Sequence, residues 1–526
     1  MKGGIVTDKH KGRIAAAIDI GSSLVRMHIS QWDGRRIVML DKLEKPVNMG
    51  HEVFSTGYIA PDTVRGLSSI LAGFSALAKE YHINRISTVA TTALREARNQ
   101  AYVLDHLSIQ SKLDVYVLED SEASALLLNA MKNSGYPSWK KIMLVYGGTG
   151  TVDFTLLTNG QIDFTHSISS GLLKIAEMMR EAAAYSCHID LAVEEYLRLF
   201  ITRDQCLEKL LQAEGIVFGS EDMQPLYQLC SDAGVPAASD AALLSRKALL
   251  AIYEQYRHLS IEQISARHRL DLLQGGILYA TLALLASLLQ MGDIEKVYCT
   301  QVSLADAVLN LSLRPRARRA YNTSLRTGAV SSALDLAACY QCDLNHAQYV
   351  AGLALTLFEK LRQLHGLSGR QSLLLHTACI LHEAGSYTNA ANSEEASYYL
   401  VRDAQIYGLR SRDTLLSANI VFPQSLLGVL HGALRGPLLG EEDMLFINKM
   451  HAILRLADAL DCSHKQKAEL IAVEQEEEHL TLALRVRGDY SLEQWMFQQS
   501  AELFRGAFGI MPRLSLRNGH GLEGGL

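Results

Sequence analysis

The chain contains 526 residues, of which 48% are hydrophobic and 20% are charged, and its formal net charge is -6. This length is too great for one hydrophobic core and predicts three or four domains. The small acidic charge excludes overall attraction to nucleic acid or to a membrane surface, so we expect neither as a specific partner. We expect a cytoplasmic protein, because no N-terminal segment combines a basic start with an apolar run and the eight Cys are scattered.

Two segments, residues 13–43 and residues 141–168, are built on one plan. Each reads as an apolar run, a turn of Gly, Ser and Thr, an alternating apolar run, a second turn and a third strand. The second turn is Asp33-Gly34 in the first segment and Asn159-Gly160 in the other, and such dipeptides are typical of two-residue hairpin turns. A long helical stretch follows each segment, so the repeated plan predicts two related α/β domains.

The Gly-rich turns around Gly21 and Gly148 occupy the same place in the two segments. If the two domains face each other, these turns lie on opposite walls of one cleft. Backbone N–H groups in such turns are free to bind anions, and phosphate above all. The duplication therefore predicts a cleft that handles phosphate.

Three further elements follow from spacing and composition. Residues 62–81 carry apolar residues at helical spacing, which predicts a helix with Asp62 as its N-cap. Residues 275–292 form the longest uncharged run, but it is shorter than the ~20 residues of a membrane span, so we expect a buried helix. Residues 296–303 read as the strand that closes the second α/β domain.

A group of four arginines around Pro315 marks the clearest boundary in the sequence. The group consists of Arg314, Arg316, Arg318 and Arg319. The segment is either a solvated linker between domains or a basic rim that guides phosphate into the cleft. Nearly all of residues 323–470 read as helix, and the rest of the chain reads as a small α/β cap.

Cys339 and Cys342 form a Cys-x-x-Cys pair, and His346 follows about one helical turn later. The pair is compatible with a zinc corner, but the sequence shows no second pair of ligands. We therefore expect the two thiols to act as small core residues.

The motif TTALREARN at residues 91–99, together with the two Gly-rich turns, resembles the Ppx/GppA family of exopolyphosphatases and guanosine pentaphosphate phosphohydrolases. The resemblance extends to ILRLADALD near the end of the helical region. It implies an α/β plus α fold made of two actin-like (ribonuclease-H-like) domains, an all-helical HD-like domain and a small C-terminal α/β domain. The expected boundaries are 10–135, 136–313, 320–469 and 470–526.

The resemblance implies hydrolysis of a terminal phosphoanhydride in inorganic polyphosphate or guanosine pentaphosphate, with Mg²⁺ as the cofactor. Asp19 corresponds to a carboxylate that binds the metal or the attacking water, although it could instead cap the adjacent hairpin. Asp153 corresponds to a second metal-binding position. The positions that correspond to substrate-binding residues are Gly21, Ser22, Arg26, Arg95, Gly148, Thr149, Gly150 and Thr151.

Among the departures from the family pattern, three bear on the metal and the general base. Ser121 stands where the family has a carboxylate expected to act as general base, so Asp120 or Glu122 would have to accept the proton. Tyr146 stands in place of a metal-binding Asp, and a phenol does not replace a carboxylate for a hard cation. Asp153 is one methylene shorter than the Glu of the family. These departures predict a weakened Mg²⁺ site.

The helical region also lacks some of the metal-binding residues that the resemblance implies. His346, His382 and Asp458 stand where an HD domain binds metal, but residues 393–396 lack the further histidines of related chains. We therefore expect no working binuclear site. We expect His382 to be satisfied by hydrogen bonds in the core.

Two functions of different classes remain open. The first is an active phosphohydrolase, which Asp19, Arg95 and the Gly-rich turns favour. The second is a catalytically weakened relative that binds polyphosphate or a nucleotide or regulates an active partner, which Ser121 and Tyr146 favour. An actin-like ATPase or sugar kinase would need an adenosine site, and the sequence shows none. A homodimer is expected by analogy alone.

Overall fold

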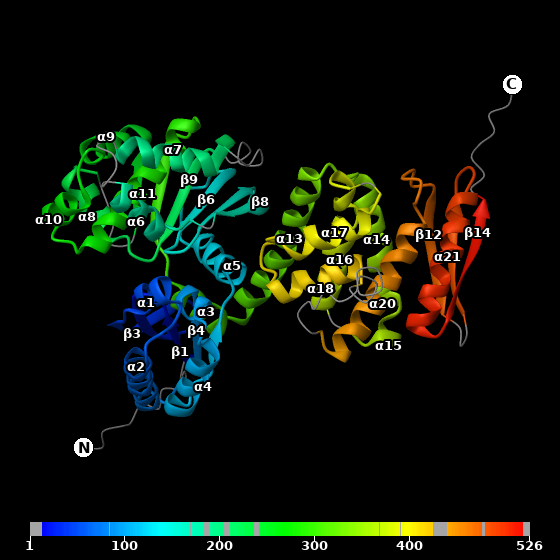
Figure 1. Cartoon of the computed structure of the whole chain (residues 1–526), viewed down its shortest axis with the longest axis horizontal. Helices are drawn as coiled ribbons and strands as arrows, with labels where there is room; N and C mark the ends of the chain where they lie inside the picture. The colour runs from blue at the N-terminus through cyan, green and yellow to red at the C-terminus, as the bar shows by residue number, and fades with distance from the viewer. Residues whose placement is uncertain are drawn as a thin grey trace, which may run out of the picture. The chain divides into compact units, whose positions relative to one another are not determined.

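The computed structural model describes residues 13–83, 85–168, 170–182, 189–202, 211–235, 241–367, 369–389, 391–423, 439–475 and 479–518. The chain divides into two compact units, Met1–Gly328 and Ala329–Leu526. These are named the N-terminal unit and the C-terminal unit, and Figure 1 labels the elements of each.

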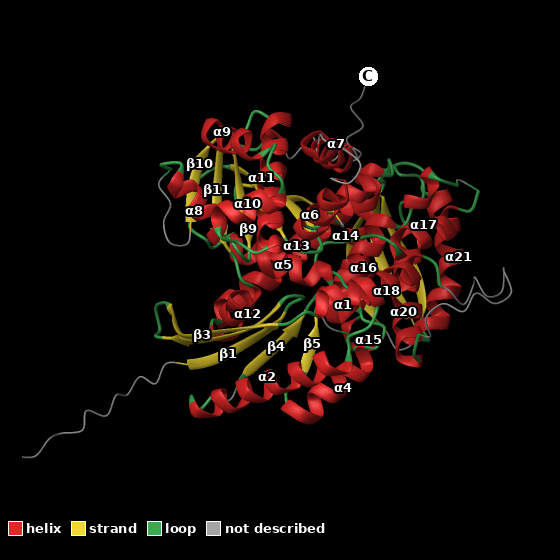
Figure 2. Ribbon diagram, turned by 60° about the vertical axis from the view of Figure 1, so that its left-hand side comes forward, coloured by secondary structure: helices red, strands yellow, loops and turns green. Residues whose placement is uncertain are grey.

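The first lobe of the N-terminal unit is built on a five-stranded sheet with the order β3-β2-β1-β4-β5. Its strands are β1 (Arg13–Ile20), β2 (Leu24–Trp32), β3 (Ile37–Pro46), β4 (Ile86–Ala90) and β5 (Val115–Val117). The first three strands pair antiparallel, and β4 and β5 run parallel to β1. Helices α2 (Pro61–Glu80) and α4 (Gln100–Ser111) cover one face of the sheet, and α12 (Leu304–Leu313) covers the other (Figure 2).

The second lobe repeats this arrangement with the order β10-β11-β9-β6-β7-β8. Its strands are β6 (Lys141–Gly147), β7 (Val152–Thr158), β8 (Gln161–Ile168), β9 (Gly215–Ser220), β10 (Ala241–Ser245) and β11 (Lys296–Gln301). The edge strand β10 pairs antiparallel and has no counterpart in the first lobe. Without it, the order β8-β7-β6-β9-β11 corresponds strand by strand to β3-β2-β1-β4-β5, and the strand directions are the same. This duplicated order is the actin-like, ribonuclease-H-like fold that the sequence predicts.

Among the described residues, six helices pack around the second sheet. They are α6 (Leu172–Ala182), α7 (Ile189–Thr202), α8 (Gln224–Asp232), α9 (Arg246–Tyr256), α10 (Ile261–His268) and α11 (Leu272–Met291). Within the described part of the chain, α11 alone is long and apolar enough to cross a membrane by length and composition, yet 78% of its apolar window is buried inside the protein. The buried helix predicted from the sequence is confirmed.

The two predicted hairpins differ in length. Asn159 and Gly160 form the predicted two-residue turn, with φ values of 52° and 78°. In the first lobe the Asp33 carboxylate accepts hydrogen bonds from the backbone N–H groups of Arg35 and Arg36 at 2.7 and 2.8 Å. An Asp that caps its own loop in this way favours a longer turn. The predicted two-residue turn is therefore wrong in the first lobe.

The helix predicted at residues 62–81 is confirmed as α2, but its N-cap is wrong. Pro61 takes the first helical position and Ala60 is the N-cap, because the fixed φ of proline suits the start of a helix. The Glu52 carboxylate accepts hydrogen bonds from the Ala60 N–H at 2.8 Å and from the Thr63 hydroxyl at 2.6 Å. Glu52 therefore supplies the polar contacts that were expected from Asp62.

The arginine-rich boundary lies in helical structure. After β11, α12 returns to the first lobe and packs over Ala15 and Ala17 of β1, whose small side chains leave room for a helix. The next helix, α13 (Pro315–Cys339), begins at Pro315 itself, a favoured place for proline. Arg316, Arg318 and Arg319 lie in this helix, and all four arginines are exposed to solvent.

The C-terminal unit combines helices with a three-stranded sheet of order β12-β13-β14. Its main elements are α14 (Leu344–Lys360), α16 (Gly369–Leu381), α17 (Ser393–Arg402), α18 (Ser411–Val421), α20 (Glu441–Ala459), β12 (Ala468–Gln475), β13 (His479–Val486), α21 (Ser491–Phe508) and β14 (Met511–Asn518). The remaining helices of the described residues are α1 (Met49–Thr56), α3 (Thr92–Glu96), α5 (Asp120–Met131), α15 (Arg362–His365) and the 3₁₀ helix η2 (Ala384–Tyr387). Leu375 of α16, Ile453 of α20 and Leu482 of β13 share one buried core within the C-terminal unit.

Candidate functional site

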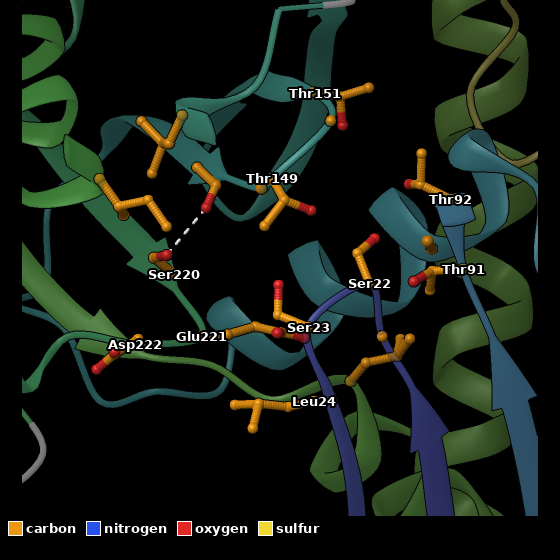
Figure 3. A pocket seen from close by; sticks show the side chains of 18 of the residues that line it. Ser22, Ser23, Leu24, Thr91, Thr92, Thr149, Thr151, Ser220, Glu221 and Asp222 are labelled. Atoms are coloured by element: carbon orange, nitrogen blue, oxygen red, sulfur yellow. Dashed lines mark hydrogen bonds between the residues drawn. The ribbon is translucent and has the colours of Figure 1, made fainter. Parts of the chain in front are cut away.

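A cavity of about 450 Å³ is lined by residues of both lobes of the N-terminal unit. Residues 21–23, named the first turn, and residues 148–151, named the second turn, both line it. Figure 3 shows hydroxyl groups of Ser22, Thr92 and Thr149 around this space, each from a different element. The structure thus brings the two Gly-rich turns to one cavity. None of the four arginines near Pro315 lines it.

The two turns have the same backbone geometry. The Gly21 N–H donates to the Leu24 carbonyl at 2.9 Å, and the Gly148 N–H donates to the Thr151 carbonyl at 2.9 Å. This tight closure points the intervening N–H groups away from the strands. Within the described part of the chain, no protein acceptor bonds the N–H groups of Ser22, Ser23, Thr149 and Gly150. Such groups are suited to phosphate oxygens.

Cross-strand pairs next to the turns occupy equivalent positions in the two lobes. Asp19 of β1 lies opposite Arg26 of β2, and Tyr146 of β6 lies opposite Asp153 of β7. Asp19 lies two residues before Gly21 of the first turn, and Tyr146 lies two residues before Gly148 of the second turn. Tyr146 is therefore the structural counterpart of Asp19, and the second lobe has its carboxylate on the neighbouring strand instead.

An ion pair crosses from one lobe to the other beside the cavity. The Arg26 Nη1 atom lies 2.6 Å from Glu221 Oε2 and 3.7 Å from Asp19 Oδ2. Asp19 is buried and is not among the residues that line the cavity, and its Oδ1 atom has no hydrogen-bond partner among the described residues. Burial and the nearby Glu221 together raise the pKa of the Asp19 carboxyl to about 8, although Arg26 opposes them. Without a cation, Asp19 therefore tends to hold a proton near neutral pH.

Asp153 and Tyr146 line the cavity from the second lobe. Burial raises the pKa of Asp153 to about 6, and its Oδ1 atom also has no partner among the described residues. Burial and the nearby carboxylates of Glu221, Asp19 and Asp153 hold the pKa of Tyr146 well above its usual value. Tyr146 is therefore a neutral phenol surrounded by three carboxylates.

Arg95 and Asp120 line the cavity as a pair. The Arg95 guanidinium donates to Asp120 Oδ1 at 2.6 Å and to the Leu118 carbonyl at 3.0 Å. The Asp120 side chain is 50% exposed, whereas that of Arg95 is 20% exposed. The structure therefore holds Arg95 in an ion pair with Asp120.

Glu122, predicted as a candidate general base, does not line the cavity. It completes a capping box at the start of α5 and accepts a hydrogen bond from the Glu119 N–H at 3.4 Å. The Tyr116 hydroxyl also donates to its carboxylate, at 3.1 Å to Oε1. These contacts hold the carboxylate at the end of the helix, so the structure does not bring Glu122 to the substrate space.

Sequence reasoning missed Glu221, Ser220 and Thr91, which all line the cavity. Gly219, Ser220 and Glu221 stand at the end of the buried strand β9, which is a third Gly-Ser corner at a strand end. The sequence pattern of this corner could have predicted that it belongs to the site, but not that Glu221 forms an ion pair with Arg26. The Ser220 hydroxyl donates to the Gly147 carbonyl at 2.9 Å and thereby joins this corner to the second turn.

Gly171 fixes the second turn in place. Its N–H donates to the Gly150 carbonyl at 3.0 Å, and the following Leu172 N–H donates to the Gly148 carbonyl at 2.8 Å. A Cβ atom on Gly171 would lie 2.3 Å from the carbonyl carbon and oxygen of Thr149. Only a residue without a Cβ allows the start of α6 to approach the turn this closely.

We expect Gly171→Ala to lower the free energy of unfolding of the N-terminal unit by about 2–4 kcal/mol, because the clash is with backbone. Gly66→Ala is the matched control, since a Cβ at this position in α2 meets nothing within 4 Å. That control should be neutral or stabilise by up to about 1 kcal/mol. Thermal unfolding of the two variants checks the prediction, and equal midpoints would contradict the close approach at Gly171.

The two orphaned carboxylate oxygens of Asp19 and Asp153 meet the chemical requirement of a hard divalent cation. Mg²⁺ is commonly held by one or two carboxylates, with water and substrate oxygens as its other ligands. No group of three His, Cys, Asp or Glu ligands converges in the described part of the N-terminal unit. The residues present therefore fit a Mg²⁺ ion that depends on the substrate for part of its coordination.

Two protein-family models match this chain, one within the N-terminal unit and one within the C-terminal unit. Residues 28–284 match the model of the Ppx/GppA phosphatase family, and residues 330–502 match the model of Ppx/GppA phosphatase domain III. A solved Ppx/GppA family member from Aquifex aeolicus is 18% identical, with 57% of this chain and 97% of that chain covered and a TM-score of 0.48. An exopolyphosphatase from Cytophaga hutchinsonii is 16% identical, with 57% and 98% covered and a TM-score of 0.46. Because the family models match most of the chain, it belongs to the Ppx/GppA phosphatase family.

Proposed function

We propose that this chain binds the end of an inorganic polyphosphate or guanosine pentaphosphate molecule in the cavity and hydrolyses its terminal phosphoanhydride. One observation carries the proposal: two equivalent turns from the two lobes present unpaired backbone N–H groups to the same cavity. Several such donors around one phosphoryl group stabilise the charge on its oxygens, which is the main requirement of phosphoryl transfer.

Asp120 is the proposed proton acceptor for the attacking water. It lines the cavity, its carboxylate is half exposed, and the ion pair with Arg95 fixes its position. A positioned general base contributes ~10²–10⁴-fold to a rate. Arg95 then has two proposed roles, to hold Asp120 and to attract the phosphate chain.

Asp19 and Asp153 are the residues that would hold Mg²⁺. When bound, this ion would supply positive charge next to the phosphoryl oxygens. The protein's own part is to present one orphaned carboxylate oxygen from each lobe. The Tyr146 hydroxyl, held neutral, can donate a hydrogen bond to a carboxylate or a phosphate oxygen.

A second candidate function is a catalytically weakened relative that binds polyphosphate or a nucleotide as a regulator. Three observations favour this second function. In the second lobe a tyrosine, Tyr146, stands at the position that Asp19 occupies in the first lobe. The Glu122 carboxylate is held in a helix cap, and the Glu221 carboxylate already pairs with Arg26. The two functions separate in one assay. Release of phosphate from long polyphosphate with Mg²⁺ supports the hydrolase, whereas binding without release supports the regulator.

We expect Arg95→Ala to weaken binding of polyphosphate by roughly tenfold under either function, since a charge-assisted contact contributes about 1.5–3 kcal/mol. Arg98→Ala is the matched control, because Arg98 lies in the same segment but does not line the cavity. Titration calorimetry of the two variants checks this difference. Unchanged affinity in Arg95→Ala would remove Arg95 from the site.

We propose that residues 320–469 contain an HD-like arrangement of helices. We further propose a cytoplasmic homodimer that takes neither nucleic acid nor membrane as a specific partner. Size-exclusion chromatography with light scattering tests the dimer directly.

A further inference from the structure

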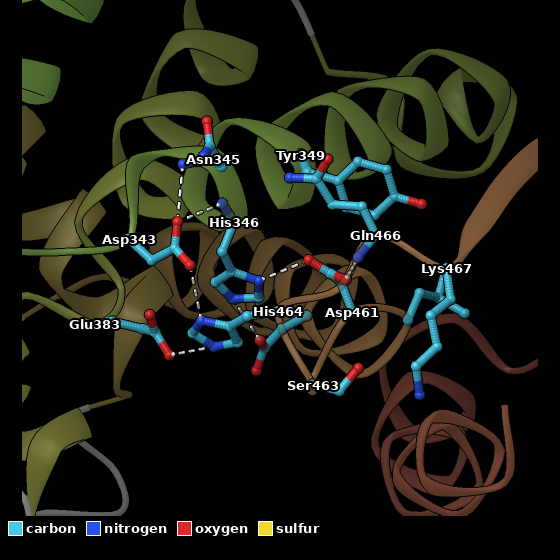
Figure 4. A network of polar contacts seen from close by, with 12 residues as sticks. Asp343, Asn345, His346, Tyr349, Glu383, Asp461, Ser463, His464, Gln466 and Lys467 are labelled. Carbon is cyan, nitrogen blue, oxygen red and sulfur yellow. Dashed lines mark hydrogen bonds and ion pairs between the residues drawn. The ribbon is translucent and has the colours of Figure 1, made fainter. Parts of the chain in front are cut away.

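Besides the cavity, charged residues gather around His346 in the C-terminal unit (Figure 4). His346 Nδ1 lies 2.9 Å from Asp461 Oδ2, and His346 Nε2 lies 3.4 Å from Asp458 Oδ1. Burial opposes a charge on this imidazole, but the two carboxylates raise the pKa of His346 to about 9. The core hydrogen bond expected for His382 is confirmed at Nδ1, which donates to the Cys379 carbonyl at 2.7 Å. The charges of this group are therefore compensated within the protein and give no reason to place a ligand there.

The cavity of the N-terminal unit has two chemically different sides. Thr92 and Thr151 line one side. Leu24 and Asp222 line the other and lie well apart from the two threonines in Figure 3. Gln274, at the start of α11, donates to Asp222 Oδ2 at 3.4 Å, so this helix start lies beside Asp222. The side of Asp222 is named the distal side, and its lining residues are Leu24, Glu221, Asp222, Asp271, Leu273 and Ile277.

The lining of the cavity is acidic. Among the described residues it holds two arginines, no lysine and five carboxylates, which are Asp120, Asp153, Glu221, Asp222 and Asp271. Both arginines are already in ion pairs at 2.6 Å, Arg95 with Asp120 and Arg26 with Glu221. Three of the carboxylates lie on the distal side, where Arg26 compensates one of them. A chain of phosphates that extends across the distal side therefore meets uncompensated negative charge.

The N-terminus of α11 lies on the distal side but is closed to anions. Free N–H groups and the helix dipole normally make such an end favourable for phosphate. Here the Asp271 carboxylate accepts a hydrogen bond from the Gln274 backbone N–H at 2.7 Å, and the Gln274 side chain accepts one from the Asp271 N–H at 3.4 Å. This capping box places a carboxylate where a phosphate would otherwise bind.

Apolar side chains also line the distal side. Leu24 lies at the start of β2, and Leu273 and Ile277 lie about one turn apart on α11. Leu273 is 39% exposed, so part of its apolar surface is available to a ligand. Covering such surface is favourable for an uncharged organic group, whereas a phosphate there would lose hydration without gaining a partner.

We infer that the cavity selects a short phosphoanhydride that carries an uncharged organic group of nucleoside size, and that a longer phosphate chain adds nothing to its affinity. This inference rests on the proposed function, since it places the terminal phosphates at the two turns. The organic group then covers Leu24, Leu273 and Ile277, and the cavity of about 450 Å³ lies within the ~300–1,000 Å³ typical of sites for small organic ligands. Long polyphosphate still enters by its end, but its next units meet the three distal carboxylates. Leu273 and Asp222 are therefore specificity-determining residues.

Titration calorimetry of the full chain in Mg²⁺, at low temperature to slow hydrolysis, compares three probes. They are inorganic tripolyphosphate, guanosine triphosphate, which has the same number of phosphates, and long-chain polyphosphate counted by its chain ends. We expect guanosine triphosphate to bind at least about tenfold tighter than tripolyphosphate, because the nucleoside covers apolar surface. We expect long-chain polyphosphate to bind no tighter than tripolyphosphate.

Two variants separate the features of the distal side. Leu273→Ser should weaken binding of guanosine triphosphate by about fivefold and leave that of tripolyphosphate unchanged. Leu272→Ser is the matched control, because Leu272 is exposed and does not line the cavity. Asp222→Lys should tighten binding of long-chain polyphosphate by about tenfold. Its control is Asp293→Lys, since Asp293 is exposed and lies outside the lining.

Circular dichroism first establishes that each variant is folded, and Asp222→Lys, in the loop between β9 and α8, serves alone if Leu273→Ser is not. The inference is overturned if long-chain polyphosphate binds tighter per chain end than tripolyphosphate, or if guanosine triphosphate binds no tighter than tripolyphosphate. It is equally overturned if folded Leu273→Ser or Asp222→Lys binds all three probes as its control does. Each of these results leaves the proposed hydrolysis in place, because phosphate still binds and its release is measured separately. Failure of all three probes to bind would overturn both the inference and the proposed function.

Discussion

Asp19→Asn is expected to reduce Mg²⁺-dependent release of phosphate from polyphosphate by at least about 100-fold. The change keeps the shape of the side chain but removes the charge that the buried Oδ1 atom would offer to the ion. Asp105→Asn is the matched control, because Asp105 is exposed on α4 and does not line the cavity. Steady-state phosphate release with both variants checks the prediction, and similar rates would exclude Asp19 from the site.

The same substitution is expected to stabilise the metal-free protein. The folded-state pKa of Asp19 is about 8, against 3.8 for an ordinary Asp, so between these values the folded state keeps a proton that the unfolded state has lost. Stability attributable to Asp19 therefore falls as the pH rises through this window, by up to about 1.4 kcal/mol per pH unit, and levels off above it. Asn carries no such proton.

The stability advantage of Asp19→Asn over the wild type should therefore grow from about pH 5 to about pH 8 in a chelator. Denaturant unfolding at several pH values measures it, with Asp105→Asn expected to follow the wild type. An advantage that does not change with pH would contradict the raised pKa. Loss of activity together with a gain in stability is the behaviour expected of a residue kept for function.

Glu221→Gln is expected to tighten polyphosphate binding roughly tenfold, because Arg26 loses its shortest ion pair and keeps only the longer contacts with Asp19 and Glu44, so that more of its charge is available to phosphate. The substitution also removes a negative charge that raises the pKa of Asp19. Calorimetric titration with polyphosphate in the presence of Mg²⁺ checks the affinity. Weaker binding would show that Glu221 supports the site, either as a metal ligand or by holding the two lobes together.

Much of the N-terminal unit could be predicted because its signals are local. The Gly-Ser and Gly-Thr turns, the Asn159-Gly160 hairpin and the alternating strands specify the same strand order in both lobes. The role of Glu122 in a helix cap could also have been predicted from neighbouring residues, because Glu119 and Glu122 have the spacing of a capping box. Reading that spacing would have removed Glu122 from the list of candidate bases.

The contacts that sequence reasoning missed join distant positions. Arg26 and Glu221 are 195 positions apart, and His346 and Asp461 are 115 apart. The return of α12 to the first lobe depends on the small side chains of Ala15 and Ala17, which only the folded sheet presents as one surface. Such pairings follow from the assembled fold and leave no periodic pattern in the sequence.

Hydrogen–deuterium exchange tests most directly whether the two turns bind phosphate together. The backbone N–H groups of residues 20–25 and 147–152 would be measured with and without polyphosphate, in Mg²⁺, at a concentration that saturates binding. We predict slower exchange in both segments on binding, since both present their N–H groups to the same cavity. Bound polyphosphate with unchanged exchange in either segment would contradict the account.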